Sequence, residues 1–138
     1  MVKVVVDTGV LAESFWDGPS RGVIELWKSG EITLCVSQPI LREYAAVISR
    51  MGASAREREE FIGVFSRNPR VFTAGSARRV DVVGEEPAGD MLIDCAVAGG
   101  ADFIITTDCR LLDLESYRGI AVAPPGEFLK AYWVGYRH

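Results

Sequence analysis

Four acidic residues lie in separated segments of the 138-residue chain, and their positions suggest one shared site: Asp7, Glu43, Asp90 and Asp108. Asp7 directly follows the apolar, β-branched run VKVVV, and Asp108 directly follows the run FIITT. Such runs are typical of strands that are buried on both faces of a parallel sheet. Because ligands bind beyond the carboxyl ends of such strands, we expect both aspartates at the same edge of the sheet.

The other acids are expected at the same edge because of the helices that carry them. Asp90 begins a predicted helix that ends at Gly99-Gly100 and leads into the strand before Asp108. Glu43 lies one turn inside the helix that follows the second predicted strand. Asp94, four residues after Asp90, shares its helical face and is a candidate for an additional ligand or an outer acceptor for water at the metal.

A cluster of carboxylates needs a compensating cation. Two carboxylates about 4 Å apart repel by about 4 kcal/mol at an effective dielectric constant of roughly 20. All-oxygen ligation favours Mg²⁺ or Mn²⁺ over softer metals. Taken singly, each acid has a structural explanation, because Asp7, Asp90 and Asp108 occupy positions where aspartate commonly caps a helix and Glu43 suits a solvated helix face. Their joint placement at one edge favours the metal site.

Other catalytic classes lack their residues in this sequence. The only histidine is His138, which argues against serine or cysteine triads and against zinc sites with histidine ligands. The cysteines, Cys35, Cys95 and Cys109, show no C-x-x-C spacing and are expected to be reduced thiols in apolar surroundings. The chain has no P-loop motif.

The net charge of −4 is unevenly distributed along the chain. Residues 42–79 contain eight arginines and four glutamates, a net charge of +4, so the remainder carries −8. This arrangement fits an acidic pocket beside a basic face that holds phosphates, and the alternative is an ordinary solvated helix surface. The candidates for phosphate contacts are Arg42, Arg50, Arg56 and Arg58.

The remaining pattern predicts an α/β fold, a three-layer α/β/α sandwich with a mainly parallel central sheet, in a single domain over residues 1–138. Strands are expected at 2–6, 32–36, 71–73, 79–83, 103–107 and 120–122, and a loop is expected at 84–87. Helices are expected at 20–29, 40–48, 55–67 and 90–98, with a helical turn at 110–114 and a terminal helix after Pro124-Pro125.

The sequence also suggests where the protein works. No segment approaches the roughly 18 uninterrupted apolar residues that a membrane span needs. The opening residues MVKVVVD reach an acid too soon for a signal peptide. We therefore expect a soluble, cytoplasmic protein without membrane association.

Three segments of the chain resemble the PIN-domain nucleases, especially the VapC-like toxin ribonucleases of prokaryotic toxin-antitoxin pairs. VVVDTGVL resembles the opening strand with its first acid, and SQPILREYAAVISR resembles the helix that carries a glutamate. GDMLIDCAVAGGADFIITTDCRLLDL resembles the segment that holds the last two acids, and it is the most specific of the three. The resemblance spans nearly the whole chain.

The resemblance implies a role for particular residues. The metal ligands would be Asp7, Glu43, Asp90 and Asp108, with Asp94 at a position where many relatives have an acid. Thr8 and Thr107 would support the site through hydroxyl contacts. One position departs from the pattern, because Gly9 stands where relatives usually have asparagine.

The resemblance further implies a reaction and partners. The reaction would be hydrolysis of RNA phosphodiester bonds with Mg²⁺ or Mn²⁺, and the partners would be the RNA substrate, a cognate antitoxin and a second copy of the chain in a homodimer. A catalytically silent scaffold with the same fold is the main alternative. An aspartyl-phosphate phosphatase or receiver is a weaker one, because Gly9 replaces the second aspartate of the former and the latter's late lysine is missing.

Overall fold

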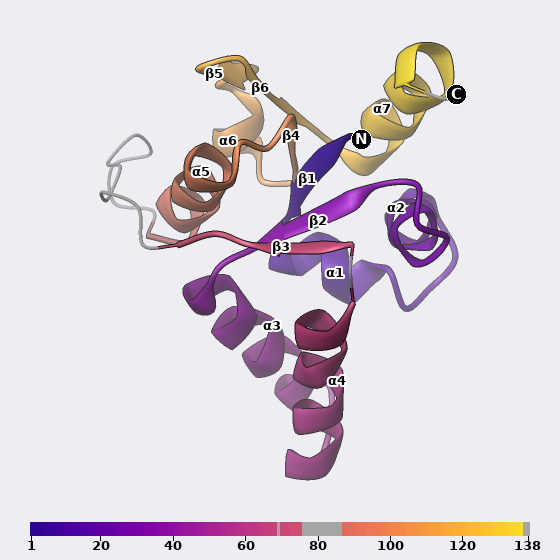
Figure 1. Cartoon of the computed structure of the whole chain (residues 1–138), viewed down its shortest axis with the longest axis vertical. Helices are drawn as coiled ribbons and strands as arrows, with labels where there is room; N and C mark the ends of the chain where they lie inside the picture. The colour runs from indigo at the N-terminus through magenta and orange to yellow at the C-terminus, as the bar shows by residue number, and fades with distance from the viewer. Residues whose placement is uncertain (69, 76–86, 137–138) are drawn as a thin grey trace.

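The computed structural model describes residues 1–68, 70–75 and 87–136. Within these residues a six-stranded sheet forms the centre of the molecule, in the order β3-β2-β1-β4-β6-β5 (Figure 1). Neighbouring strands are parallel except for the β5–β6 pair, which is antiparallel. The strands are β1 (Lys3–Val6), β2 (Thr33–Val36), β3 (Val71–Thr73), β4 (Phe103–Ile105), β5 (Ser116–Tyr117) and β6 (Ile120–Ala123).

Helices cover both faces of the sheet. They are α1 (Thr8–Glu13), α2 (Pro19–Lys28), α3 (Gln38–Arg50), α4 (Ala55–Arg67), α5 (Pro87–Gly99), α6 (Cys109–Leu112) and α7 (Pro125–Ala131), followed by the π-helical turn η1 (Tyr132–Tyr136). Helix α5 packs against β1, β2 and β4 on one face. Helices α1 to α4 and α7 contact one another in a chain on the other face (Figure 1). The predicted three-layer α/β/α architecture is therefore confirmed.

Local signals in the sequence account for the helix boundaries. Ser37 caps α3 by accepting a hydrogen bond from the backbone N–H of Ile40. Ser54 and Glu57 form a reciprocal capping box at the start of α4, and these hydrogen bonds lower the pKa of Glu57. Gly100 follows α5 with a φ of 66°, the left-handed conformation in which glycine commonly ends a helix.

The structure differs from the prediction at the start of α5 and in the short strand β5. Helix α5 begins at Pro87 instead of Asp90, because proline is well tolerated in the first turn, where its missing N–H costs nothing. The predicted loop at 84–87 is therefore wrong at Pro87, and its other residues lie outside the described ranges, as does the strand expected at 79–83. The short strand β5 was not predicted, because two residues are too few to show a period of two.

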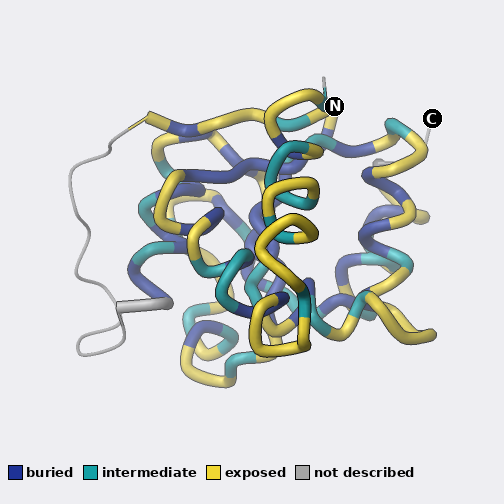
Figure 2. The backbone as a smooth tube through the Cα atoms, turned by 90° about the horizontal axis from the view of Figure 1, so that it is seen from below, coloured by how far each residue is buried: buried dark blue, intermediate teal, exposed yellow. Residues whose placement is uncertain are grey.

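The core lies between the sheet and its two helical layers (Figure 2). On the face opposite α5, Phe65 stacks on Trp27 with ring centroids 5.3 Å apart and contacts Tyr44 at 5.6 Å, which ties α4 to α2 and α3. Among the described residues, no helix is both long and apolar enough to cross a membrane.

Helix α5 approaches the sheet closely at its C-terminal end. The Lys3 ammonium group, at the start of β1, donates a 2.7 Å hydrogen bond to the Gly99 carbonyl. A Cβ atom on Gly99 would overlap the Cys35 sulfur in β2, so only glycine permits this spacing. From Gly99 back to Asp90 the helix rises about 13 Å, and β1 rises about 13 Å from Lys3 to Asp7. The first turn of α5 is thus level with the carboxyl end of β1.

Replacement of Gly99 tests this close packing. Alanine usually stabilises a helix relative to glycine by up to about 1 kcal/mol, but Gly99→Ala should instead cost roughly 1–3 kcal/mol through overpacking against Cys35. Urea denaturation followed by circular dichroism measures the change. Gly63→Ala is the matched control, because its Cβ would meet only the flexible end of the Arg67 side chain. A stabilising effect of both substitutions would contradict the close approach of α5.

Candidate functional site

The parallel register places Asp7 next to Thr106. Val6 pairs with Ile105 across β1 and β4, so the next residues along, Asp7 and Thr106, are neighbours at the carboxyl edge. Paired residues in a parallel sheet project to the same face, and side chains alternate between faces with a period of two. Lys3 projects towards α5, and Asp7, four residues later, therefore projects towards the same layer.

A fully buried hydroxyl group links two of the predicted acids. The Thr106 hydroxyl donates a 2.6 Å hydrogen bond to the Asp7 carboxylate and accepts a 3.0 Å hydrogen bond from the Asp108 backbone N–H. The Thr8 hydroxyl donates to the other Asp7 oxygen at 3.3 Å. The ends of β1 and β4 are thus held in one hydrogen-bonded arrangement.

Of Asp7, Asp90 and Asp108, the three aspartates at possible helix-capping positions, only one caps a helix through its side chain in the described structure. Asp108 caps α6 by accepting a hydrogen bond from the Arg110 backbone N–H at 2.9 Å. Asp7 occupies the N-cap position of α1, but its side chain makes no capping bond to the described backbone. Asp90 is the fourth residue of α5 and lies inside the helix. Capping therefore does not account for Asp7 or Asp90.

Asp90 is the most deeply buried of the predicted acids, with 1% of its surface exposed. Its position in the first turn of α5 is favourable for a negative charge, because the helix dipole is positive there. Its Oδ2 atom is buried and makes no hydrogen bond to the described residues, although Asp90 takes part in other interactions. Asp94 follows one turn later and is half-buried.

Glu43 lies in the second turn of α3 and is half-buried. The adjacent residue, Tyr44, is fully buried and donates its hydroxyl hydrogen to the Val6 carbonyl at the end of β1. This contact anchors that turn of α3 beside the carboxyl edge. Burial raises the pKa of Tyr44 well above its usual range, with smaller contributions from Cys95, Asp7 and Cys35. Tyr44 is therefore a protonated structural donor and not a base.

The four acids suit a divalent cation in residue type and in the elements that carry them. They supply only oxygen atoms, the donors that Mg²⁺ and Mn²⁺ prefer. Within the described ranges, however, no three acidic, histidine or cysteine side chains form a group that could hold a metal ion. Ligation by Asp7, Glu43, Asp90 and Asp108 remains a prediction and requires these side chains to converge around the ion.

Thr106, and not Thr107, makes the hydroxyl contact to the site. Thr107 is exposed, whereas Thr106 is fully buried between Asp7 and Asp108. The alternation of side chains explains this correction, because adjacent residues at the end of a strand project to opposite sides. The register of the β1–β4 pair identifies Thr106 as the neighbour of Asp7. The sequence alone does not show that β1 pairs with β4.

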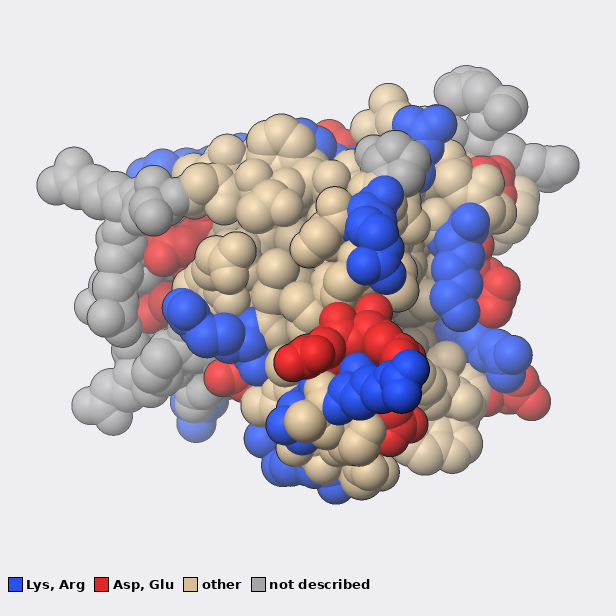
Figure 3. Space-filling view, turned by 60° about the horizontal axis from the view of Figure 1, so that its bottom comes forward, with Lys and Arg blue, Asp and Glu red and all other residues tan. Residues whose placement is uncertain are grey.

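The candidate phosphate-binding arginines differ in their surroundings. Arg42 and Arg50 are exposed on α3. Arg56 pairs with Glu60 at 3.2 Å, and the guanidinium group of half-buried Arg58 donates to the Ser49 hydroxyl and the Ala53 carbonyl. Figure 3, which turns the α3–α4 end of the molecule forward, shows acidic and basic side chains interspersed there. The described part of the arginine-rich segment 42–79 therefore does not form an uninterrupted basic face.

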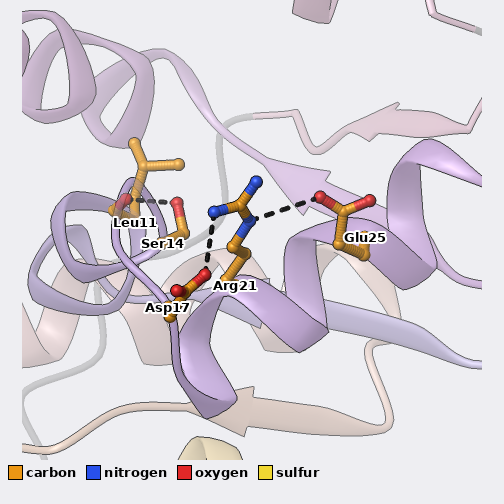
Figure 4. A network of polar contacts seen from close by, with 5 residues as sticks. All are labelled: Leu11, Ser14, Asp17, Arg21 and Glu25. Atoms are coloured by element: carbon orange, nitrogen blue, oxygen red, sulfur yellow. Dashed lines mark hydrogen bonds and ion pairs between the residues drawn. The ribbon is translucent and has the colours of Figure 1, made fainter.

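A separate cleft of about 360 Å³ lies where α1 turns into α2, and it contains none of the predicted ligands. Its lining residues are Glu13, Trp16, Asp17, Gly18, Pro19 and Ser20. Beside it, Arg21 bridges Asp17 and Glu25 at 3.1 and 3.7 Å (Figure 4). These side chains are half to fully exposed, so the ion pairs contribute little to stability.

Comparison with known proteins identifies one family. The sequence model of the family described as PIN domain matches residues 3–110, which include all four acids. PIN domains are typically nucleases and generally use divalent metal ions. Among curated proteins, none matches this chain.

Thr106 provides a test of the hydrogen-bonded arrangement. Thr106→Val preserves the shape of the side chain but removes both of its hydrogen bonds, and it should cost roughly 1–3 kcal/mol. Thr106→Ser keeps the hydroxyl group and should recover most of this loss. Thr107→Val, the matched control at an exposed position, should stay within about 0.5 kcal/mol of the unsubstituted protein. Equal losses for both valine variants in urea denaturation would contradict the assignment.

Proposed function

The chain belongs to the PIN domain family, and we propose that it is a Mg²⁺- or Mn²⁺-dependent endoribonuclease acting at the carboxyl edge of its sheet. Membership in the family supports a nuclease, and thus a hydrolase. The observation that carries the proposed metal-dependent reaction is the hydrogen-bonded arrangement of Asp7, Thr106 and Asp108 at the carboxyl edge, level with the first turn of α5, which holds buried Asp90. A carboxylate site built on rigid strand ends is suited to a metal-assisted reaction.

In the proposed reaction, water attacks a phosphodiester phosphorus atom and the bond to the departing ribose oxygen breaks. When bound, a divalent ion supplies a Lewis acid that assists the attacking water and stabilises the departing oxygen. Asp7, Glu43, Asp90 and Asp108 would hold the ion, and Thr106 would fix the Asp7 carboxylate through its 2.6 Å hydrogen bond. Asp94 would be an additional ligand or a hydrogen-bond acceptor for water.

We further propose, from the resemblance to VapC-like proteins, that the chain is the toxin of a toxin-antitoxin pair in the cytoplasm. Its antitoxin would cover the acidic edge. A homodimer would be consistent with the exposed apolar side chains of Trp133 and Val134, which are 48% and 90% exposed on η1. Analytical ultracentrifugation of the purified chain tests the dimer directly.

A catalytically silent scaffold is the alternative to the nuclease, because Gly9 replaces the asparagine usual in relatives. The backbone at Gly9 is exposed, and a Cβ atom there would contact nothing within 4 Å. The position therefore has room for a larger side chain, and nothing in the packing requires glycine. Calorimetric titration with Mn²⁺ separates the alternatives, since a scaffold without a metal site would show no saturable binding.

Substitution of the strand-end acids tests the proposed site. Asp7→Asn and Asp108→Asn should each abolish saturable Mn²⁺ binding and reduce RNA cleavage by at least about 100-fold, because each removes a ligand charge. The assay is cleavage of a mixed panel of structured and single-stranded RNAs with Mg²⁺, Mn²⁺ or EDTA. Asp113→Asn is the matched control, because Asp113 is an exposed aspartate at the end of α6.

The outcomes distinguish the residue assignment from the function itself. Metal-dependent cleavage that survives both substitutions would refute the assignment of these ligands. Saturable Mn²⁺ binding by the unsubstituted chain without cleavage of any RNA would favour a metal-binding scaffold over a nuclease.

Arg42 should contribute more to RNA binding than Arg56. Arg42 is exposed and precedes Glu43, whereas Arg56 lies in the first turn of α4 and pairs with Glu60. The salt dependence of binding is the slope of the logarithm of the association constant against the logarithm of the salt concentration. If Arg42 contacts one phosphate, Arg42→Gln should make this slope for single-stranded RNA shallower by about 0.7. Arg56→Gln should leave the slope nearly unchanged. Fluorescence anisotropy of a labelled oligoribonucleotide over a range of salt concentrations measures both, and a larger effect at Arg56 would contradict this ranking.

A further inference from the structure

Two buried cysteines face each other across the contact between β2 and α5. Cys35 lies in the middle of β2 and Cys95 lies in α5, and 0% and 2% of their respective surfaces are exposed. Their sulfur atoms are 3.7 Å apart, and the Cys35 sulfur also lies 3.6 Å from the Cys95 carbonyl oxygen. A disulfide bond is about 2.05 Å long, so the two sulfurs would need to approach by roughly 1.7 Å.

The two elements that carry these cysteines are unusually close because Gly99 has no side chain. A Cβ atom at this position would overlap the Cys35 sulfur. The neighbouring helix residue Ala96 is also small and fully buried. The approach of the two sulfurs is therefore built into the packing of α5 on the sheet and does not depend on a loop conformation.

We propose that Cys35 and Cys95 are a modification site, at which a small hydroperoxide oxidises the two thiols to an intramolecular disulfide that fixes α5 against β2. This proposal does not rest on nuclease activity. It goes beyond the proposed nuclease site, whose residues lie at the acidic edge.

The reaction balances with hydrogen peroxide as the oxidant. The Cys35 thiolate attacks one peroxide oxygen and becomes a sulfenic acid, and the other oxygen leaves as water after taking up a proton. The Cys95 sulfur then displaces the sulfenic hydroxyl group, which leaves as a second water molecule. In total, two thiols and one peroxide give one disulfide and two waters. The pKa of the Cys35 thiol is lowered, chiefly by its hydrogen bond with Cys95 and further by the charge of Lys3, against the opposing effect of burial.

The bond would restrain the helix that carries the buried acid. Cys95 lies five residues after Asp90 and directly after Asp94 on α5. Without the bond, α5 is held to the sheet here by packing, by the non-covalent Cys35–Cys95 contacts and, at the helix end, by the Lys3–Gly99 hydrogen bond. A covalent link at Cys95 would suppress local opening of the whole helix, including its first turn.

Mass spectrometry and hydrogen exchange test the proposal on the full chain. The Cys109→Ser variant removes the exposed thiol and should fold normally, because Cys109 is at the surface. After treatment with hydrogen peroxide, we expect a loss of two hydrogen atoms, a Cys35–Cys95 linked peptide after digestion, and reversal by dithiothreitol. We also expect amide exchange in α5 to slow by at least about tenfold, because a crosslink suppresses local opening, while exchange in α7 stays unchanged.

Two results would overturn the proposal. One is the absence of a linked peptide, whether Cys35 and Cys95 gain oxygen atoms or stay unchanged. This result would show that the two thiols do not form a disulfide bond. The other is a linked peptide without slower exchange in α5, which would refute the restraint of the helix. In the Cys35→Ala, Cys109→Ser double variant the loss of two hydrogen atoms should disappear, and its persistence would contradict the assigned pair.

Discussion

The close contact between α5 and the β1–β2 pair is the constraint on which the site depends. Gly99 permits it, and the Lys3 hydrogen bond to the Gly99 carbonyl fixes the end of the helix at the amino end of β1. The rise along α5 from Gly99 to Asp90 nearly equals the rise along β1 from Lys3 to Asp7. The contact therefore brings the first turn of α5 to the level of Asp7. A substitution that displaced α5 at its C-terminal end would therefore move Asp90, which lies nine residues away.

The arrangement of Asp7, Thr106 and Asp108 shows how one buried hydroxyl group can fix two strand ends that carry acidic residues. Bringing carboxylates together is costly, but a charge-assisted hydrogen bond from a buried hydroxyl offsets part of this cost. Thr106 supplies that bond to Asp7 and also accepts the Asp108 N–H, so one hydroxyl fixes both strand ends. Among the described residues, the second Asp7 oxygen accepts only the longer, weaker hydrogen bond from the Thr8 hydroxyl, at 3.3 Å. Such a carboxylate keeps lone pairs available to a ligand at the edge of the sheet.

The sequence predicts the fold well where signals are local. The buried strand runs and the Gly99-Gly100 end of α5 can each be recognised from a few adjacent residues, and the structure confirms them. The choice between Thr106 and Thr107 could not be made this way, because it depends on the pairing of β1 with β4. Whether the acids converge also depends on contacts between distant elements. Among the described residues, no three acidic, histidine or cysteine side chains form a group that could hold a metal ion. Elements are thus predictable from the sequence, whereas contacts between distant elements require the structure.

Charge counts along a sequence are a poor guide to charged surfaces. Residues 42–79 carry a net charge of +4, yet Arg56 pairs with a glutamate on its own helix and Arg58 is held by backbone and hydroxyl oxygens. A guanidinium group held in this way has fewer N–H donors left for a phosphate, and Glu60 offsets part of the charge of Arg56. Proximity to the acidic edge therefore matters more than the total number of arginines. By this reasoning the start of α3, where exposed Arg42 adjoins Glu43, is the part of the basic segment best placed to position a substrate, and the tip of the α3–α4 pair serves mainly to join the two helices.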